Sequence, residues 1–238
     1  MVKSRLTRIK KSNYAEKIDR HISPYQSINQ IKSIEPYLWG RGAKCKRSCL
    51  TWLRTRYCLL HCYVGVLRSE SVFHGELSDC CMVTVKRETD PDVMEILIMQ
   101  MPTGKTVDTG SGKLQYGRAM RHKVASQCAI GALGMYLLFC FHCSGEMDDG
   151  VRPDFTNNSS WFDIKILTDG KLSTYTKEMS RKSYTDRVRE CFSDLNIISN
   201  AYGHWGRVSA PTALELEEIA PEFIRILGTY LCLLQRYY

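Results

Sequence analysis

Residues 48–67 read SCLTWLRTRYCLLHCYVGVL, and this stretch decides the fold. Apolar side chains recur in it at spacings of three and four residues, which places them on one face of a helix. They are Leu50, Leu53, Tyr57, Leu60, Val64 and Leu67. The stretch therefore predicts a long amphipathic helix that buries one face in a core.

The residues after this helix predict a small antiparallel sheet. Residues 80–88 and 93–101 are rich in β-forming side chains, and they flank Asp90-Pro91, which is a turn signal. We expect these two segments to form a β-hairpin. Residues 161–167, WFDIKIL, are the candidate for a further short strand.

Three other segments predict helices. Residues 124–143 are mostly apolar and predict a helix that is buried on most sides. Residues 176–192 predict a helix with one polar side, and residues 207–220 predict another helix. Pro221 can open a last helix, because proline is tolerated in the first turn. The expected fold class is mainly α with a small antiparallel β-hairpin or sheet.

The chain is expected to hold one domain behind a basic tail. Residues 1–36 are polar and show no sustained periodicity, and residues 1–20 contain seven basic but only two acidic residues. We therefore expect a flexible tail over residues 1–36 and a folded domain over residues 37–238. The net charge of +8 favours a polyanionic partner, although a solvated tail would give the same charge.

Composition argues against several classes of protein. With 44% apolar residues the chain is too apolar to be disordered. It has no run of 18 apolar residues, so no membrane span is expected, and residues 1–25 lack the apolar core of a secretory signal. Residues 110–114, GSGKL, lack the spacing and the Ser or Thr of a nucleotide-binding phosphate loop. We expect no cofactor and no small-molecule substrate.

The eleven cysteines allow three interpretations. An oxidised scaffold disagrees with the odd count, the length of the chain and the lack of an export signal. Cys140 and Cys143 have the spacing of half a zinc site, but no other pair of cysteines supplies a matching half. Buried free thiols are the expected interpretation, because a free cysteine behaves as a small core residue. Zinc at Cys140 and Cys143 stays an alternative.

A cluster of basic and imidazole side chains precedes the apolar helix. It consists of Arg118, Arg121, His122 and Lys123. Cations at the start of a helix oppose its macrodipole, and they become favourable when an anion is bound there. The cluster therefore predicts a DNA phosphate contact, with a solvated turn as the alternative.

The tetrapeptide His204-Trp205-Gly206-Arg207 carries a second candidate site. His204 and Arg207 are three residues apart and so lie on the same side of a helical turn. Together they can contact one phosphate, with the arginine as a bidentate donor and the histidine as a donor or proton shuttle. Taken alone, such a pair is common by chance and favours a structural role.

The order of several segments resembles one family closely. The segments are LRTRYCLLHCYVGVLRSESVFHGELSD, MEILIMQMPTGKT, YGRAMRHK, CAIGALGMYLLFCFH, WFDIKIL and HWGR. Over residues 37–238 the chain resembles the second domain of the yeast inner-kinetochore centromere-binding protein, a family shared with proteins of Crypton-type mobile elements in fungi. The resemblance implies a fold similar to the catalytic domain of phage-integrase-type tyrosine recombinases. It also implies double-stranded DNA as partner, a nuclear location and a possible homodimer.

The resemblance further implies a site for one DNA phosphate. In this fold two Arg, a Lys and a His stabilise the charge that develops on the scissile phosphate, and a Tyr attacks it. The matching residues are Arg68, Lys105, His204, Arg207 and, as nucleophile, Tyr238 or its neighbour Tyr237. They are expected to be catalytic groups or, in a member that does not cleave, phosphate contacts.

The sequence departs from the family pattern near these residues. Residues 227–230, LGTY, lack the tryptophan of the family, Val107 replaces the usual Asn, and the chain ends at the candidate nucleophile. We therefore expect a domain truncated at its C-terminus that binds DNA mainly through phosphates without cleaving it. Two alternatives stay open: an active recombinase that forms a covalent phosphotyrosine link, and a protein-interaction module without a DNA role.

Overall fold

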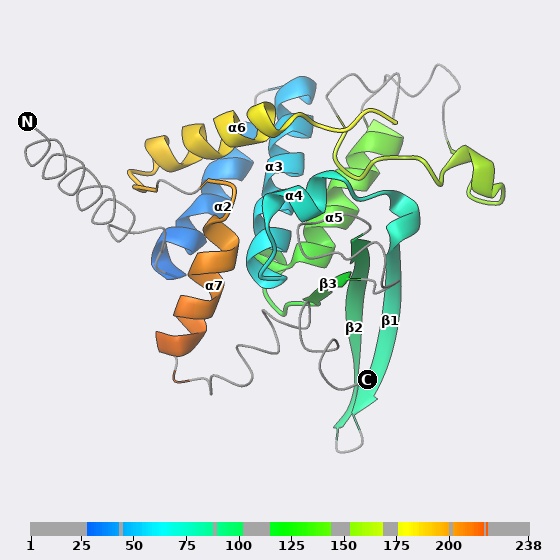
Figure 1. Ribbon diagram of the computed structural model, residues 1–238, viewed down its shortest axis with the longest axis horizontal. Coiled ribbons are helices and arrows are strands. Elements are labelled where there is room, and N and C mark those ends of the chain that lie inside the picture. Colours follow the sequence, from blue (N-terminus) through cyan, green and yellow to red (C-terminus); the bar gives the residue numbers. More distant parts are fainter. Residues whose placement is uncertain are drawn as a thin grey trace, which may run out of the picture.

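A computed structural model describes most of the chain between residues 28 and 218 (Figure 1). The described residues are 28–42, 45–87, 90–101, 115–143, 153–168, 176–199, 202–216 and 218. The helices are α2 (Ile28–Gly42), α3 (Lys46–Val64), α4 (Ser69–Phe73), α5 (Ala129–Leu138), α6 (Arg181–Asp194) and α7 (Trp205–Leu216). The strands are β1 (Cys80–Arg87), β2 (Asp90–Met101) and β3 (Gln115–Met120). The expected fold class, mainly α with a small antiparallel sheet, is confirmed.

Helix α3 is the centre of the fold. It packs against α2, α5 and α7 and also contacts β3, and Figure 1 shows it between α2 and α7 on one side and the sheet on the other. The predicted helix is confirmed, and Leu50, Leu53 and Tyr57 of its apolar face are buried in the core. Burial is not limited to that face: every residue from 52 to 59 is buried, Arg54 and Arg56 included, because neighbouring elements pack on several sides of the helix.

The three strands form one antiparallel sheet in the order β1-β2-β3. The predicted hairpin is confirmed, with Cys80 opposite Met99 in the register. Asp90 and Pro91, expected as its turn, lie at the start of β2 instead. The register shifts between Lys86 and Arg87, and this irregularity accommodates the proline, which cannot donate a ladder hydrogen bond.

Strand β3 was missed by the sequence analysis. It holds Gly117 and Ala119, which pair with Met99 and Leu97 of β2. Small residues give no β signal in the sequence, but here they let the sheet approach the helical core: a Cβ on Gly117 would lie 2.9 Å from Leu67 Cδ1. Leu97, Met99 and Ala119 are buried against the helices.

The two ends of the hairpin differ in burial. Figure 1 shows β1 and β2 reaching beyond the helices at their far end. Side chains on both faces of β1 are accordingly exposed from Cys81 to Lys86. Only the part of the sheet next to α3 and α5 contributes to the core.

Two segments differ from their expected structure. Residues 28–36, expected in the tail, form the first half of α2, and Ile34 is buried against the core even though Pro36 lies inside the helix. Residues 161–167, expected as a strand, form only an isolated bridge between Lys165 and Glu76. Ile164, Ile166 and Leu167 are nevertheless buried in the core. The apolar side chains of this segment therefore reflect its burial and not pairing within a sheet.

The apolar helix predicted over residues 124–143 is divided into three parts. A 3-10 turn covers Ala125–Gln127, α5 covers Ala129–Leu138, and a π turn covers Phe139–Cys143. Cys128 caps α5, since its sulfur accepts a hydrogen bond from the Gly131 N–H at 3.3 Å. The regular helix therefore begins five residues later than residue 124.

The cysteines of the described residues are all free thiols. Cys58, Cys62, Cys128, Cys140 and Cys191 are buried, which agrees with their interpretation as core residues. None of the helices in the described part of the chain combines the length and apolar composition that a bilayer crossing requires.

Candidate nucleic-acid interface

The start of α7 is anchored by Trp205. Its side chain is buried, its ring stacks on Tyr63 of α3 at 5.9 Å between centroids, and it meets Phe192 of α6 edge-on at 5.8 Å. The indole N–H donates to the Tyr184 hydroxyl at 3.3 Å. This contact with two helices fixes where the residues on either side of Trp205 point.

Gly206 brings α7 against the backbone of α3. A Cβ at this position would lie 2.7 Å from the carbonyl carbon and oxygen of Cys62, closer than any side chain tolerates. The middle two residues of the HWGR motif therefore have a structural role that the sequence analysis did not assign. They hold His204 and Arg207 beside the C-terminal end of α3.

Arg68 lies at the same end of α3, directly before α4. It adopts an extended backbone at the N-cap of α4, and the next residue binds the loop before α7. Ser69 donates to the Gly203 carbonyl twice, from its backbone N–H at 3.2 Å and from its hydroxyl at 3.1 Å. Arg68 and His204 are therefore neighbours of a directly bonded pair, although they are far apart in the sequence.

Several charged side chains lie close enough to His204 to affect its pKa. Partial burial is the largest cause that lowers its pKa below the ordinary value for histidine. The positive charges of Arg68, Arg181 and Arg207 lower the pKa further, and Glu70 opposes them. His204 is thus an exposed imidazole among three guanidinium groups and one carboxylate.

Arg181 and Glu70 complete this cluster. Arg181 Nη1 lies 2.7 Å from Glu70 Oε1, so one arginine is already paired with the carboxylate. The Arg68 Nε is buried and has no hydrogen-bond partner among the described residues. The cluster therefore carries more positive than negative charge, which suits an anionic ligand.

Arg181 was not predicted from any pattern in the sequence. It stands at the start of α6, 113 positions after Arg68, in a stretch with several other basic residues. No spacing rule separates Arg181 from those neighbours, because only the packing of α6 on α4 brings it close. The three residues from the sequence that the structure brings together are Arg68, His204 and Arg207.

The basic cluster before α5 is arranged differently from its prediction. Arg118 is exposed on β3, and Arg121 forms an ion pair with Glu95 of β2. His122 and Lys123 are exposed beyond the end of β3. Regular helix α5 begins at residue 129, but the His122 backbone N–H donates to the sulfur of its N-cap residue Cys128 at 3.5 Å, so the cluster lies beside the helix N-terminus. The DNA phosphate contact stays a prediction.

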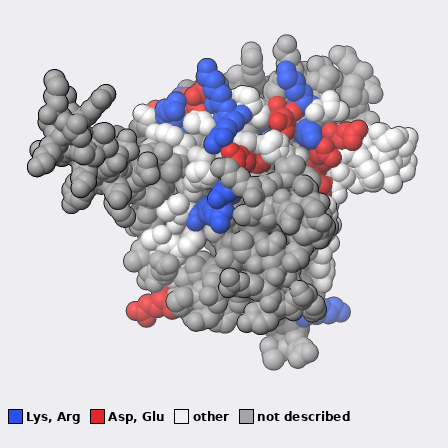
Figure 2. All heavy atoms as spheres, viewed as in Figure 1, with Lys and Arg blue, Asp and Glu red and all other residues white. Residues whose placement is uncertain are grey.

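Charges of both signs are mixed on the surface. Figure 2 shows Lys and Arg side chains beside Asp and Glu over the upper part of the molecule, where α6 lies in Figure 1. On this face no uniform basic surface is visible among the described residues. Anion binding there depends on local clusters of arginine.

The remaining candidates fall into two groups. Lys105, Tyr237 and Tyr238 lie outside the described residues. Cys140 is buried, burial raises the pKa of its thiol to about 12, and Cys143 is exposed. Within the described residues no three His, Cys, Asp or Glu side chains form a group that could hold a metal ion, so the zinc alternative gains no support.

Comparison with known families identifies most of the chain. A family model described as the second domain of the centromere DNA-binding protein complex CBF3 subunit matches residues 43–228. This match agrees with the resemblance seen in the sequence motifs. Among curated protein sequences, none matches the chain.

Solved structures show where the fold recurs. A complex of Flp recombinase with a Holliday junction has a TM-score of 0.51 at 13% identity, over 96% of this chain and 50% of that one. A complex of Flpe with a Holliday junction has a TM-score of 0.52 at 14% identity, over 100% of this chain and 56% of that one. The chain spans about half the length of these structures, and the likeness shows that it shares their fold.

Proposed function

This chain belongs to the family of the second domain of the CBF3 centromere DNA-binding subunit, and on that premise we propose that it binds double-stranded DNA mainly through backbone phosphates. The proposed contact is the cluster of Arg68, His204 and Arg207, joined by Arg181. As in the centromere-binding relative, the proposed place of action is nuclear chromatin.

One observation carries this proposal. Three arginines from different elements of the fold surround His204, and their charges add to partial burial in lowering its pKa. Guanidinium groups bind phosphate oxygens with paired hydrogen bonds, and a neighbouring imidazole can donate another. A phosphate placed here would balance the excess of positive charge.

We further propose that the domain binds DNA without cutting it. The support comes from the sequence: Val107 replaces an asparagine of the family pattern, and residues 227–230 lack its tryptophan. Both departures lie close in sequence to candidate catalytic residues, whereas the residues of the phosphate cluster itself are kept. Binding of a phosphate requires only the cluster, whereas cleavage also requires the lysine and the tyrosine nucleophile.

The salt dependence of DNA affinity tests the binding proposal. Each neutralised phosphate releases counterions, so the logarithm of affinity should fall steeply with the logarithm of salt concentration. Replacing Arg68, His204 and Arg207 together by Gln should weaken binding and reduce that slope by about 0.9 for each phosphate that is no longer neutralised. Circular dichroism verifies that the variant is folded, and a flat response of the wild-type protein to salt contradicts the proposal.

A second candidate function is strand cleavage by a tyrosine recombinase mechanism. The observation that favours it is the proximity of two Arg and one His of the types that such enzymes use. A suicide DNA substrate traps any phosphotyrosine link on a denaturing gel, because religation is prevented. An adduct that disappears in Tyr238→Phe or Tyr237→Phe would establish cleavage, and no adduct with wild-type protein supports binding alone.

Dimerisation and origin are further parts of the proposal. A homodimer would place two clusters on one DNA duplex, and the mass of the protein measured by light scattering with and without DNA tests it. Descent from a fungal mobile element is proposed from the Crypton-type resemblance. A role as a DNA-independent interaction module gains no support from arginines gathered around one imidazole.

A further inference from the structure

A second group of basic side chains lines a pocket between α2, α3 and α6. The pocket has a volume of about 310 Å³ and lies at the start of α3. Arg41, Ser48, Thr51 and Trp52 line it from α2 and α3, and Arg187 and Glu190 line it from α6. None of the residues assigned above to the DNA-binding cluster takes part in it.

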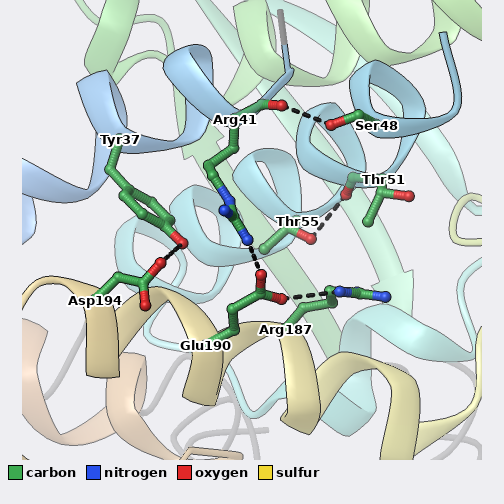
Figure 3. Close-up of polar contacts among 8 residues, drawn as sticks. All are labelled: Tyr37, Arg41, Ser48, Thr51, Thr55, Arg187, Glu190 and Asp194. Atoms are coloured by element: carbon green, nitrogen blue, oxygen red, sulfur yellow. Dashed lines mark hydrogen bonds and ion pairs between the residues drawn. The ribbon is translucent and has the colours of Figure 1, made fainter. Parts of the chain in front are cut away.

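Two arginines are held side by side in this pocket. Glu190 Oε1 contacts Arg41, and Glu190 Oε2 lies 2.8 Å from Arg187 Nη1, so one carboxylate bridges both guanidinium groups (Figure 3). Arg41 is further fixed over the Trp52 ring, at 5.4 Å from its centroid. Glu190 thus positions both arginines, and the negative charge of Asp194, which accepts a hydrogen bond from Tyr37, also acts on Arg41.

Both arginines remain able to bind a ligand. Their side chains are 33% and 44% exposed, for Arg41 and Arg187 respectively. A guanidinium group has five N–H donors, and within the described contacts Glu190 accepts one hydrogen bond from each. Donors on both groups are therefore available toward the open pocket.

We propose that this pocket binds a backbone phosphate of the DNA that the Arg68 cluster contacts. The inference rests on the proposed DNA-binding function and adds a second anchoring point to it. Helix α6 joins the two sites, with Arg181 in one and Arg187 in the other. The pocket lies at the start of α3 and the Arg68 cluster beside its end, and a helix of 19 residues spans about 28 Å. At about 3.4 Å per phosphate along a strand, the two sites would contact phosphates about eight positions apart.

The competing explanation is a structural ion-pair network that fastens α2 to α6. The two explanations differ in the effect of Glu190. In a phosphate site the carboxylate repels the ligand, so its removal should strengthen DNA binding. In a purely structural network its removal should only lower the stability of the fold.

The first experiment measures affinity for a 20-bp duplex between roughly 50 and 200 mM salt, the range over which phosphate contacts change affinity most visibly. Arg187→Ala should reduce the salt slope by about 0.9, so the loss of affinity over this range becomes about threefold smaller. Arg189→Ala is the matched control, because Arg189 lies on the same helix, pairs with Asp186 and does not line the pocket. An Arg187→Ala slope equal to the wild-type slope overturns the inference.

The second experiment uses Glu190→Gln in the same titration together with thermal unfolding. The expected result is tighter DNA binding and a steeper salt slope than wild type. Unchanged DNA affinity with a lower unfolding temperature would show a structural network and overturn the pocket as a phosphate site. If the wild-type protein bound no DNA, the proposed function would fail with it, whereas normal wild-type binding with unaffected variants rejects the pocket alone.

Discussion

Ser69 donates two hydrogen bonds to the Gly203 carbonyl, one from its backbone at 3.2 Å and one from its hydroxyl at 3.1 Å. The pair joins the N-terminus of α4 to the loop before α7. Arg68 and His204 each adjoin one member of the pair in the sequence. The geometry of the proposed phosphate site therefore depends on a serine that need not touch the phosphate.

Ser69→Ala should loosen the proposed phosphate site. The backbone hydrogen bond remains, but the hydroxyl bond is removed, so the free energy of unfolding should fall by about 1 kcal/mol. DNA affinity should fall as well, because Arg68 and His204 are held less firmly. Urea unfolding and a DNA titration measure the two effects. Ser71→Ala on the same helix is the control, and equal DNA affinities for the two variants would contradict the positioning role.

Gly206→Ala should destabilise the fold strongly. The added Cβ would lie 2.7 Å from backbone atoms of Cys62, which cannot rotate away as a side chain can. A loss of about 1–3 kcal/mol in the free energy of unfolding is expected, as for other overpacked cores.

Gly134→Ala is a matched control for that variant. Gly134 lies inside α5 with no atom within 4 Å of an added Cβ. Alanine is the better helix former there, so the free energy of unfolding should rise by about 0.5–1 kcal/mol. Urea unfolding measures both variants, and equal effects would show that the contact with Cys62 is not tight.

Acid should destabilise the protein through His61. This side chain is completely buried, and burial lowers its pKa from 6.5 to about 4. Protonation is easier in the unfolded chain, so stability is full above pH 6.5 and falls as the pH drops toward 4. The shift corresponds to a loss of about 3 kcal/mol, at about 1.36 kcal/mol per pKa unit.

Urea unfolding at neutral pH and near the lowered pKa checks this prediction. His61→Gln should show a smaller drop in stability between the two conditions than the wild-type protein. His142→Gln, at an exposed histidine, should keep the full drop. An identical pH dependence of all three proteins would exclude His61 as the cause.

DNA affinity should rise as the pH falls through the pKa of His204. Partial burial and then the nearby arginines lower that pKa in the free protein, and a bound phosphate opposes the arginines and favours the imidazolium. Binding is therefore expected to take up a proton. Titrations between about pH 5.5 and 8 cover the range in which a histidine titrates, and His204→Gln should remove the effect. A pH response that survives this substitution would assign the proton to another group.

Local patterns predicted the parts of the fold that depend on nearby residues. Apolar residues three and four apart predicted α3, and two β-rich segments predicted the hairpin of β1 and β2. Strand β3 was missed because Gly117 and Ala119 carry no local β preference, and they form a strand only through pairing with β2. Residues 161–167 have side chains that favour a β-strand, but among the described residues they pair only through the isolated bridge of Lys165 with Glu76.

The sequence by itself determined the helical core, the hairpin and the residue types of a phosphate site, because periodicity and motif order are local properties. Only the tertiary structure decided that Arg181 joins Arg68 and Arg207 around His204, and that Arg41 and Arg187 share one carboxylate. Hydrogen bonds and ion pairs form only at contact distance, and salt screens exposed charges that are more than about 10 Å apart. Which charged side chains become partners therefore depends on how the helices pack, and the spacing of residues along the chain does not predict it.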